Sequence, residues 1–411
     1  MKIRILFFFP YCPYPPTTGA HQRCMAIVSA LLRLGYEVIF LGVENYRKRT
    51  WTPESVVSLK KAGVKEVYIY HVTLPDFFKN ILIALYYRLF HDEFLPWNSR
   101  FYVPAGMRAW FAAIRSDVQP DIIWMNYVHW DSLIDRRGGR QTEMIVDYLD
   151  PVSLNGKMQY ALKNCFTKKP FAVIHRDVLE EDFFTRKTFT IDDAELRIIT
   201  GYDKIIAISR TEADIIEQSG KTKPVFFLPV TMPPVDCDNR YEQPPVFAAG
   251  PNLFNVQGYY YFTEKVLPAI LKTIPDFSLT VSGSVTDLVQ PRDGVTRIGF
   301  VDDIGKVYCE SRFAICPVLG GTGQQIKIVE AMAHGLTVVA TKFSAGSSPI
   351  IHGVNGFVAA DASEFAGYCV RLWNDPGLCR KMGGEARKSI VENYSEEILL
   401  KQLSRILGTP Q

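Results

Sequence analysis

The sequence predicts an α/β protein made of two halves, each with a parallel sheet covered by helices. Its 411 residues suit two domains of about 200 residues better than one. Short, continuous apolar runs alternate with stretches in which apolar residues recur at helical spacing. A proline-rich stretch without periodicity lies between Thr231 and Pro245, and its composition is typical of a linker between domains.

The first half is predicted to begin with a strand at residues 3–9 and a breaker-rich turn at residues 10–19. Apolar residues then recur at helical spacing over residues 24–32, up to Gly35, and a second apolar run follows at residues 38–41. Such a β-α-β unit gives a parallel sheet with helices on its faces. Further buried strands are predicted at residues 121–125, 144–148 and 204–208.

The second half repeats this pattern. We expect an N-terminal domain at residues 1–232, a linker at 233–245 and a C-terminal domain at 246–395. Ligands of such sheets lie at the carboxyl ends of the strands. The strands predicted in this half are residues 246–249, 278–282, 313–317 and 337–341, and the helices are residues 259–274 and 326–334.

Composition and charge exclude several classes of protein. Hydrophobic residues make up 47% and charged residues 22%, which excludes collagen-like, coiled-coil and disordered chains. The net charge of +3 is too small to predict a nucleic-acid partner. The eight cysteines are dispersed, without metal-site spacing, so we expect reduced thiols and no metal.

The sequence has no stretch of about 18 apolar residues, so no membrane span is predicted. The N-terminus lacks the pattern of a secretory signal. A cytoplasmic protein is therefore expected. Residues 1–100 carry 13 Lys/Arg against 7 Asp/Glu. An amphipathic, aromatic-rich run at Phe77–Phe94 and the basic triplet Arg47–Arg49 suggest peripheral contact with an anionic membrane surface. An ordinary core-facing helix is the alternative for that run.

A glycine-rich turn follows the predicted strand at residues 313–317. Glycines let backbone amides approach a ligand closely, and a helix that begins near Gly323 would direct its unpaired N–H groups toward an anion. The predicted anion-binding residues are Gly320, Gly321, Thr322, Gly323, Gln324 and Gln325.

Lys327 and Glu330 are expected on one face of that helix, together with His334. Lys327 would neutralise a diphosphate, and Glu330 would accept hydrogen bonds from the two hydroxyls of a ribose. A Gly-rich turn beside a solvated, charged helix face is the alternative. The segment is not a P-loop, and no Gly-x-Gly-x-x-Gly opens the first β-α unit.

The segment from Gly320 to Thr341 resembles the donor-site signature of family-4 glycosyltransferases. That resemblance implies the GT-B fold, in which two Rossmann-like domains have parallel sheets facing across a central cleft, and a C-terminal helix at residues 396–411 that packs back on the N-terminal domain. Further stretches resemble the family in the same order: Pro15–Arg23, Ile206–Ser209, Gly299–Asp303, His352–Phe357 and Asp375–Ser395.

The resemblance also implies an activity. A sugar would pass from a nucleotide-diphosphate donor to a glycan, lipid-linked or other acceptor, as in polysaccharide biosynthesis, with retention of configuration and without a metal or other cofactor. The departing diphosphate then needs fixed positive potential. The helix end near Gly323 and Lys327 would supply it, and Glu330 would hold the ribose.

Further site residues come from the same resemblance. In the C-terminal half these are Asn252 and Asn255, after the first strand, and Phe300 and Val301, where backbone groups would read the base. Departures from the family pattern also occur here: Thr322 replaces a frequent glutamate, and the usual Arg and Lys after the first strand are missing. These departures keep two other functions open, a non-catalytic nucleotide-sugar-binding scaffold and a nucleotide-sugar epimerase.

In the N-terminal half, Gly19 would let the first loop contact the diphosphate, and Arg23 would reach an anionic donor or acceptor unless it is a surface residue. Asp150 closes a buried strand where acceptor-site residues of the family lie, and we count it with Lys327 and Glu330 as a candidate catalytic residue. An Asx cap before Pro151 is its alternative role. His129, beyond another strand, is a weaker candidate for acceptor binding.

Overall fold

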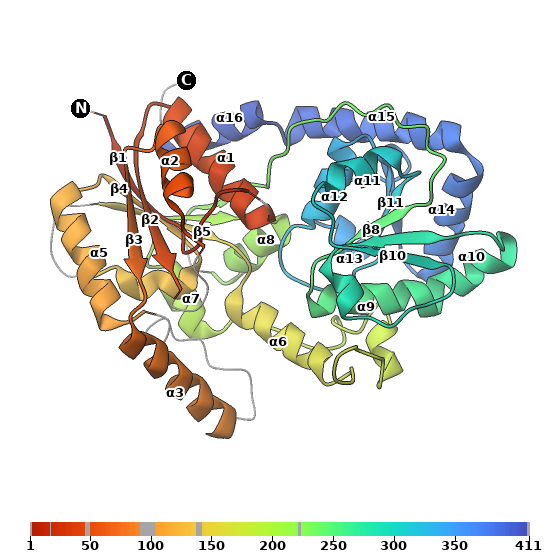
Figure 1. Cartoon of the computed structure of the whole chain (residues 1–411), viewed down its shortest axis with the longest axis horizontal. Helices are drawn as coiled ribbons and strands as arrows, with labels where there is room; N and C mark the ends of the chain where they lie inside the picture. The colour runs from red at the N-terminus through yellow and green to blue at the C-terminus, as the bar shows by residue number, and fades with distance from the viewer. Residues whose placement is uncertain are drawn as a thin grey trace. The chain divides into compact units, whose positions relative to one another are not determined.

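The computed structural model describes residues 2–16, 18–45, 50–90, 103–136, 142–220 and 223–408. The chain divides into two compact units (Figure 1). Unit 1 comprises Met1–Leu154, Thr190–Val230 and Glu396–Gln411, and unit 2 comprises Asn155–Phe189 and Thr231–Ser395. The boundary expected at residue 232 is therefore wrong for Asn155–Phe189.

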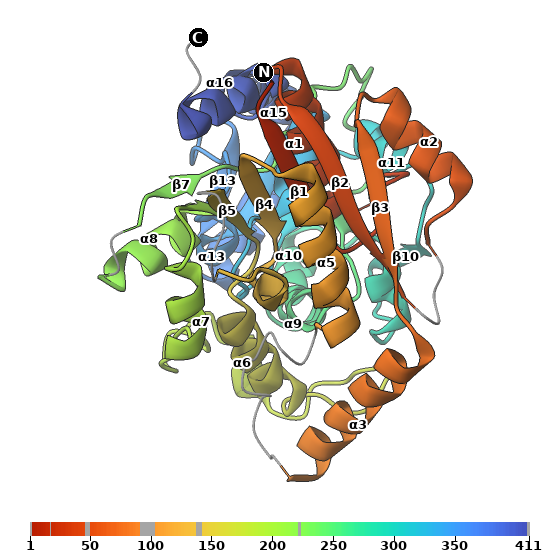
Figure 2. The ribbon, with the colours of Figure 1, turned by 90° about the vertical axis from the view of Figure 1, so that its left-hand side faces the viewer.

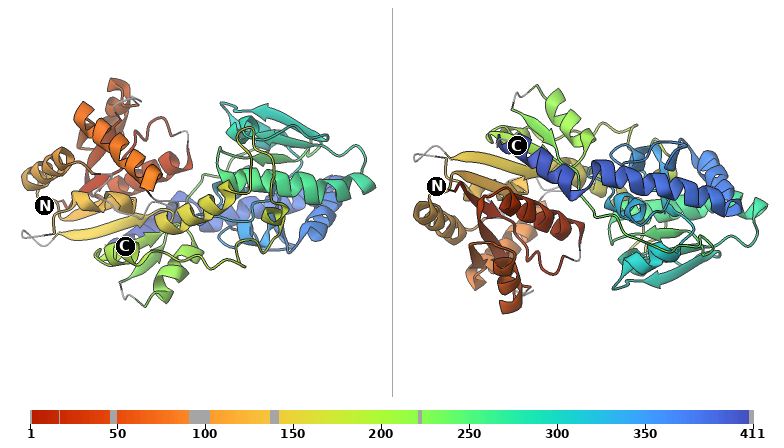
Figure 3. Two further views of the ribbon diagram at one scale, coloured as in Figure 1. Left: turned by 90° about the horizontal axis from the view of Figure 1, so that it is seen from below. Right: turned by 90° about the horizontal axis from the view of Figure 1, so that it is seen from above.

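The physical reason is that this segment packs on helix α9 (Leu253–Tyr261) of unit 2. The two lie side by side in Figures 1 and 3, where the segment is yellow to yellow-green and α9 is green. The buried Gln257 on α9 donates from Nε2 to the carbonyl oxygen of Val178 at 2.8 Å, and Phe184 contacts Phe254 with ring centroids 6.0 Å apart.

Unit 1 contains a parallel sheet in the order β3-β2-β1-β4-β5-β6-β7 within the described residues. Figure 2 shows its central strands side by side, with α5 over one face. The strands predicted in this half are confirmed, and β3 and β7 are additional. The strands are β1 (Arg4–Phe8), β2 (Glu37–Glu44), β3 (Glu66–His71), β4 (Ile122–Asn126), β5 (Glu143–Tyr148), β6 (Lys204–Ala207) and β7 (Val225–Phe227).

Both faces of this sheet are buried. Alternate residues of β1 point to opposite faces, so Ile5 and Phe7 pack with α1 and α16 while Leu6 and Phe8 pack with α5. The helices of unit 1 are α1 (Gly19–Arg33), α2 (Pro53–Lys61), α3 (Leu74–Phe90), α5 (Ala105–Val118), α7 (Asp193–Ile199), α8 (Arg210–Gln218) and α16 (Glu396–Leu407), with the 3-10 turn η1 (Val128–Leu133).

Unit 2 contains a second parallel sheet, in the order β10-β9-β8-β11-β12-β13. Its four predicted strands are confirmed, and the edge strands β10 and β13 are additional. The strands are β8 (Val246–Ala248), β9 (Leu279–Ser282), β10 (Val295–Gly299), β11 (Ala314–Cys316), β12 (Val338–Thr341) and β13 (Gly356–Ala359).

The helix predicted at residues 259–274 begins earlier, at Leu253, and is interrupted by a π-helical turn over Phe262–Val266. Pro268 accounts for the interruption because it has no N–H for the regular ladder. The other helices are α6 (Val152–Lys163), which crosses the boundary between the units, α10 (Leu267–Thr273), α11 (Ile304–Glu310), α12 (Ile326–Ala333), α13 (Lys342–Ala345), α14 (Ala362–Asn374) and α15 (Pro376–Asn393).

The residues expected as a linker, 233–245, form neither helix nor strand. They are tied to unit 2 by a disulfide between Cys237 and Cys309 of α11, whose Cα atoms are 5.3 Å apart. The prediction that all cysteines are free thiols is therefore wrong for this pair. No spacing signal marks this pair, because the two cysteines are 72 residues apart.

In the described ranges, no helix combines the length and the hydrophobicity that crossing a bilayer requires. The run predicted as amphipathic corresponds to α3, and its last residues, 91–94, lie outside the described residues, as does Arg47–Arg49. One stripe of α3 exposes large apolar side chains, so a core-facing role is wrong for that stripe. It comprises Leu74, Phe78, Ile81, Leu82 and Leu85.

Candidate functional site

The topology of unit 2 selects one place for a ligand. The strand connections run in opposite directions from the neighbouring strands β8 and β11, and ligands of open α/β sheets bind outside the carboxyl ends of strands at such a switch point. Two loops lie there: residues 249–252, which lead into α9, and residues 317–325, which lead into α12. The second is the predicted glycine-rich turn.

The glycines of this loop serve close packing as well as chain reversal. A Cβ on Gly320 would lie 1.9 Å from the Phe184 ring, so any side chain there requires the ring to shift. Gly321 has a φ of +130°, which side-chain-bearing residues rarely adopt. Of the other loop residues, Thr322 and Gln324 are buried, and Gly323 and Gln325 are half-buried.

Helix α12 begins at Ile326, three residues later than the predicted start near Gly323. The reason is local, because Gln325 has a φ of −77° and a ψ of 84° and is therefore not helical. No side chain of the described residues caps the start of α12. Its first amide groups, including that of Lys327, consequently remain an anion-binding end of the helix.

Lys327 places a positive charge in that first turn. Its Nζ donates to Oδ1 of Asn255 and lies 5.2 Å from the centre of the Phe247 ring. Neither partner is charged. Burial lowers the pKa of Lys327, and the nearby Cys316 acts weakly in the opposite direction. An anion at this point would supply the compensation that the surroundings do not.

Asn252 and Asn255 build the support for that lysine. Asn252 caps α9, because its Oδ1 accepts from the backbone N–H of Asn255 at 2.9 Å. Nδ2 of the buried Asn255 donates to the carbonyl oxygen of Gly250 at 2.9 Å, which turns its Oδ1 toward Lys327. The two asparagines therefore position the cation, and direct ligand contact by either stays a prediction.

Glu330 lies one turn further along α12. Its Oε2 accepts from the Tyr308 hydroxyl at 3.3 Å, and burial raises its pKa, although this hydrogen bond acts in the opposite direction. The Tyr308 ring lies 5.3 Å from the His334 ring. His334 Nδ1 lies 2.7 Å from the carbonyl oxygen of Glu330, so the histidine packs at the end of α12.

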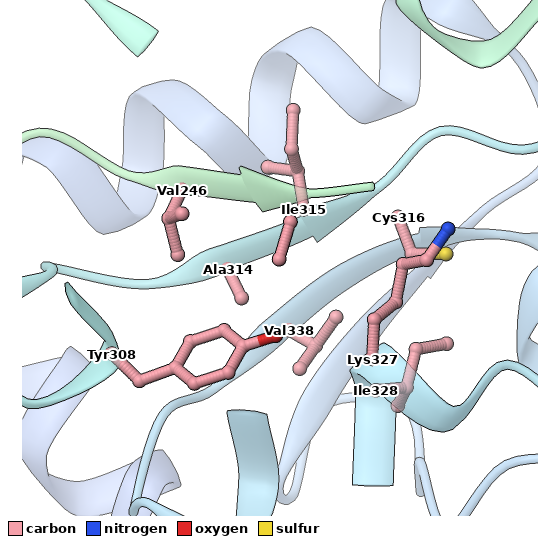
Figure 4. Close-up of a pocket in the computed structure, with 9 residues that line it drawn as sticks. Val246, Tyr308, Ala314, Ile315, Cys316, Lys327, Ile328 and Val338 are labelled. Carbon is pink, nitrogen blue, oxygen red and sulfur yellow. The ribbon is translucent and has the colours of Figure 1, made fainter. Parts of the chain in front are cut away.

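The space between α12 and the sheet is small and mostly apolar (Figure 4). The Tyr308 hydroxyl points into it, and the Lys327 side chain extends past Cys316 with its amine beside the sulfur (Figure 4). This space has no room for a diphosphate, and the predicted anion-binding position is the loop outside it. The lining residues are Val246, Ala248, Tyr308, Ala314, Ile315, Cys316, Lys327, Ile328 and Val338.

Phe300 and Val301 follow the edge strand β10 directly. Gly299 has a φ of +73°, which turns the chain outward at this point. The Phe300 side chain is 72% exposed and Val301 is half-buried. Their proposed contact with the base stays a prediction.

In unit 1, the prediction that Arg23 binds an anionic ligand or lies at the surface is wrong. It is 2% exposed, and its Nε and Nη2 donate to the two carboxylate oxygens of Asp147 at 2.9 and 2.8 Å. Its Nη1 donates to the carbonyl oxygen of Leu228 at 2.6 Å. The guanidinium is buried and its charge is already paired with the Asp147 carboxylate, which leaves it no part in binding an anion.

The other candidates of unit 1 lie at the carboxyl ends of β1, β4 and β5. Gly19 is the first residue of α1, after the N-cap Thr18. His129 lies in η1, where burial lowers its pKa to about 4, so the ring is neutral near pH 7. Asp150 is exposed and has a φ of +57°. Ligand contacts of these three residues stay predictions.

The turn that carries Asp150 is held by Glu195, which the sequence analysis missed. The buried Glu195 carboxylate accepts from the Tyr148 hydroxyl at 2.6 Å and from the backbone N–H groups of Val152 and Ser153, both at 2.8 Å. These bonds tie the end of β5 to the start of α6. No local signal marks Glu195, because it lies more than 40 residues away in sequence.

Two further residues at the site of unit 2 were also missed. Tyr308 contacts Glu330, and Asn155 of α6 contacts Thr322 across 167 residues of sequence. In the sequence Asn155 is a polar residue without a recognisable motif around it, and nothing there indicates that it lies at the loop.

Known proteins are similar to the part of the chain that contains this site. Residues 244–375 match the family described as Glycosyl transferases group 1, a range that includes both loops. The chain is 27% identical over 222 residues to an uncharacterized glycosyltransferase of Haemophilus influenzae. The match covers 51% of the chain and 62% of that relative, less than two thirds of its length.

Solved structures match over the whole chain. Sucrose-phosphate synthase from Thermosynechococcus elongatus has a TM-score of 0.64 at 16% identity, with 99% of this chain and 98% of that one covered. HepE of Anabaena, in complex with UDP, has a TM-score of 0.62 at 13% identity, with both chains fully covered. The chain therefore has the α/β GT-B fold of two Rossmann-like domains, and residues 244–375 support a relationship to glycosyltransferase group 1.

Proposed function

We propose that the chain transfers a sugar from a nucleoside diphosphate donor to a glycan or lipid-linked acceptor. The observation that carries the proposal is the ammonium of Lys327, held by the uncharged Asn255 and Phe247 at the uncapped start of α12. A diphosphate there accepts hydrogen bonds from both the lysine ammonium and the backbone N–H groups of the helix. The match to glycosyltransferase group 1 over the same residues supports this reading.

The proposed roles follow from the charges of the site. The diphosphate is the leaving group, and its growing negative charge is stabilised by Lys327 and the amides of α12. Glu330 accepts hydrogen bonds from the ribose hydroxyls. Asp150 is the candidate catalytic residue at the acceptor site. We extend the proposal to metal-independent turnover, because this fixed positive potential serves the leaving diphosphate directly. We extend it also to retention of configuration, because the segment from Gly320 to Thr341 resembles the donor-site signature of family-4 glycosyltransferases.

Turnover tests the proposal. The purified chain is incubated with UDP-, GDP-, ADP- and CDP-sugars and a membrane glycan extract, with and without a chelator. We expect acceptor-dependent release of nucleoside diphosphate that survives chelation, and an α-linked product from an α-linked donor in the nuclear magnetic resonance spectrum. Binding without turnover would indicate the scaffold function, and conversion of donor without acceptor would indicate an epimerase.

We also propose that α3 contacts an anionic membrane surface, which would bring the enzyme to a lipid-linked acceptor. Its exposed stripe includes Phe78 and Leu82, of which Leu82 is 65% exposed. The excess of Lys/Arg in residues 1–100 favours anionic lipid. Vesicles with phosphatidylglycerol should sediment the parent chain, and Leu82→Glu should release it. Equal sedimentation of parent and variant would reject the contact.

A further inference from the structure

A chain of hydrogen bonds joins α6 to the glycine-rich loop inside unit 2. Nδ2 of Asn155 donates to Oγ1 of Thr322 at 3.1 Å, and Nε2 of Gln159 donates to Oδ1 of Asn155 at 2.5 Å. Asn155 and Gln159 are four residues apart, on one face of the helix. Gln159 therefore fixes the orientation of the Asn155 amide, with its nitrogen toward the loop.

This arrangement leaves a hydrogen-bond donor at the loop. An amide nitrogen carries two N–H groups, and among the described residues the one acceptor of Asn155 is Thr322. Asn155 is half-buried and not enclosed in the core, and its second N–H is the donor that this arrangement leaves for a ligand. Thr322 lies three residues before the N-cap of α12, next to the proposed diphosphate position.

We infer that Asn155 is a specificity-determining residue for the transferred sugar. It holds Thr322 in place and offers its second N–H to a hydroxyl or acetamido oxygen of the sugar. The inference rests on the proposed function, because a diphosphate at Lys327 is what brings the attached sugar to the loop. All three side chains are uncharged, which suits the hydroxyl and amide groups of a neutral hexose or N-acetylhexosamine.

Asn155→Leu tests the inference, since it nearly keeps the size of the side chain, removes both N–H donors and adds no negative charge beside the proposed diphosphate position. The probes are the best binder among UDP, GDP, ADP and CDP, and its glucose conjugate, and the readout is the calorimetric Kd of each. We expect the Kd of the conjugate to rise about tenfold and that of the bare diphosphate to stay within about twofold, a selective loss of ~1.4 kcal/mol.

Two further variants complete the experiment. Asn374→Leu makes the same chemical change at an exposed residue of α14 and should alter neither Kd. Thr322→Val keeps the backbone amide of the loop and removes only the hydroxyl that Asn155 contacts, so it should reproduce the loss for the conjugate. Combining it with Asn155→Leu should add little, because the two residues act as a pair. Equal loss for both probes, or no loss, would overturn the role of Asn155 while leaving the proposed function standing. Failure of all four diphosphates to bind the parent would overturn both.

Discussion

Each unit has a basic residue on a helix that follows a strand of its sheet, but the partners of the two basic residues differ. In unit 1, Arg23 of α1 is bound by both oxygens of a buried carboxylate, Asp147. In unit 2, Lys327 of α12 has the uncharged partners Asn255 and Phe247. A basic residue on a helix next to a switch point is therefore not enough to predict an anion site. The charge of the partner separates a cation that is paired within the core from the one that we propose binds a ligand.

The largest expected effect is on the stability of unit 1. Arg23→Met leaves the Asp147 carboxylate buried and unpaired, which costs about 3–5 kcal/mol. Arg33→Met is the matched control on the same helix, because its ion pair with Glu396 is exposed and should cost less than about 1 kcal/mol. Urea-induced unfolding of the two variants measures the difference. Equal stability would mean that the Arg23–Asp147 pair is not structural.

A second prediction concerns the glycine-rich loop. Gly320→Ala places a methyl group 1.9 Å from the Phe184 ring, and overpacking of this kind costs about 1–3 kcal/mol. Gly250→Ala, in the neighbouring loop, meets no atom within 4 Å and should be nearly neutral. Thermal unfolding compares the two variants. A stable Gly320→Ala variant would show that Phe184 does not hold the loop closely.

Glu330 gives a smaller, selective effect. Glu330→Gln replaces a charged acceptor for the ribose hydroxyls with a neutral one, so the Kd of a nucleoside diphosphate should rise about five- to tenfold, or ~1–1.4 kcal/mol. The 2′,3′-dideoxy analogue should bind parent and variant alike, because it has no hydroxyls to offer. Calorimetry with both ligands decides this. An equal loss for the analogue would remove Glu330 from ribose binding.

The smallest expected effect is a pH dependence of diphosphate affinity that comes from Lys327. Burial lowers the pKa of Lys327 in the free protein, and a bound diphosphate would raise it again. Its contribution to affinity is therefore complete below the lowered pKa and is lost as the pH rises through it. Calorimetric affinity should fall as the pH rises toward the ordinary lysine pKa of about 10.4 in the parent and stay flat in Lys327→Met. A parallel decline of affinity in the parent and the variant would show that the pH dependence comes from another group.

The sequence predicted the regular parts of this fold well. Apolar runs such as residues 3–9 and 246–249 have a direct cause, since strands of a parallel sheet are buried on both faces. Residues Asn155–Phe189 were misplaced because their contacts with α9 are long-range packing. The start of α12 was placed too early because a glycine pattern does not reveal where helical dihedral angles begin.

The candidate site was predictable only where chemistry and local spacing coincide. Lys327 and Glu330 lie on one short helix, so their spacing is visible in the sequence. The partner that decides the role of a cation is distant: Asp147 is 124 residues from Arg23, and Asn255 is 72 residues from Lys327. Arg23 was misjudged for this reason, and Asn155, 167 residues from Thr322, was not considered.

Calorimetry of Lys327→Met tests the central claim most directly. The control is Lys306→Met, at an exposed position on α11, and the ligands are UDP, GDP, ADP and CDP. The account predicts that at least one diphosphate binds the parent, that Lys327→Met weakens its binding about 10- to 100-fold through the loss of a charge-assisted contact worth ~1.5–3 kcal/mol, and that Lys306→Met leaves it unchanged. Unaltered binding by Lys327→Met would contradict the claim that this lysine holds the diphosphate.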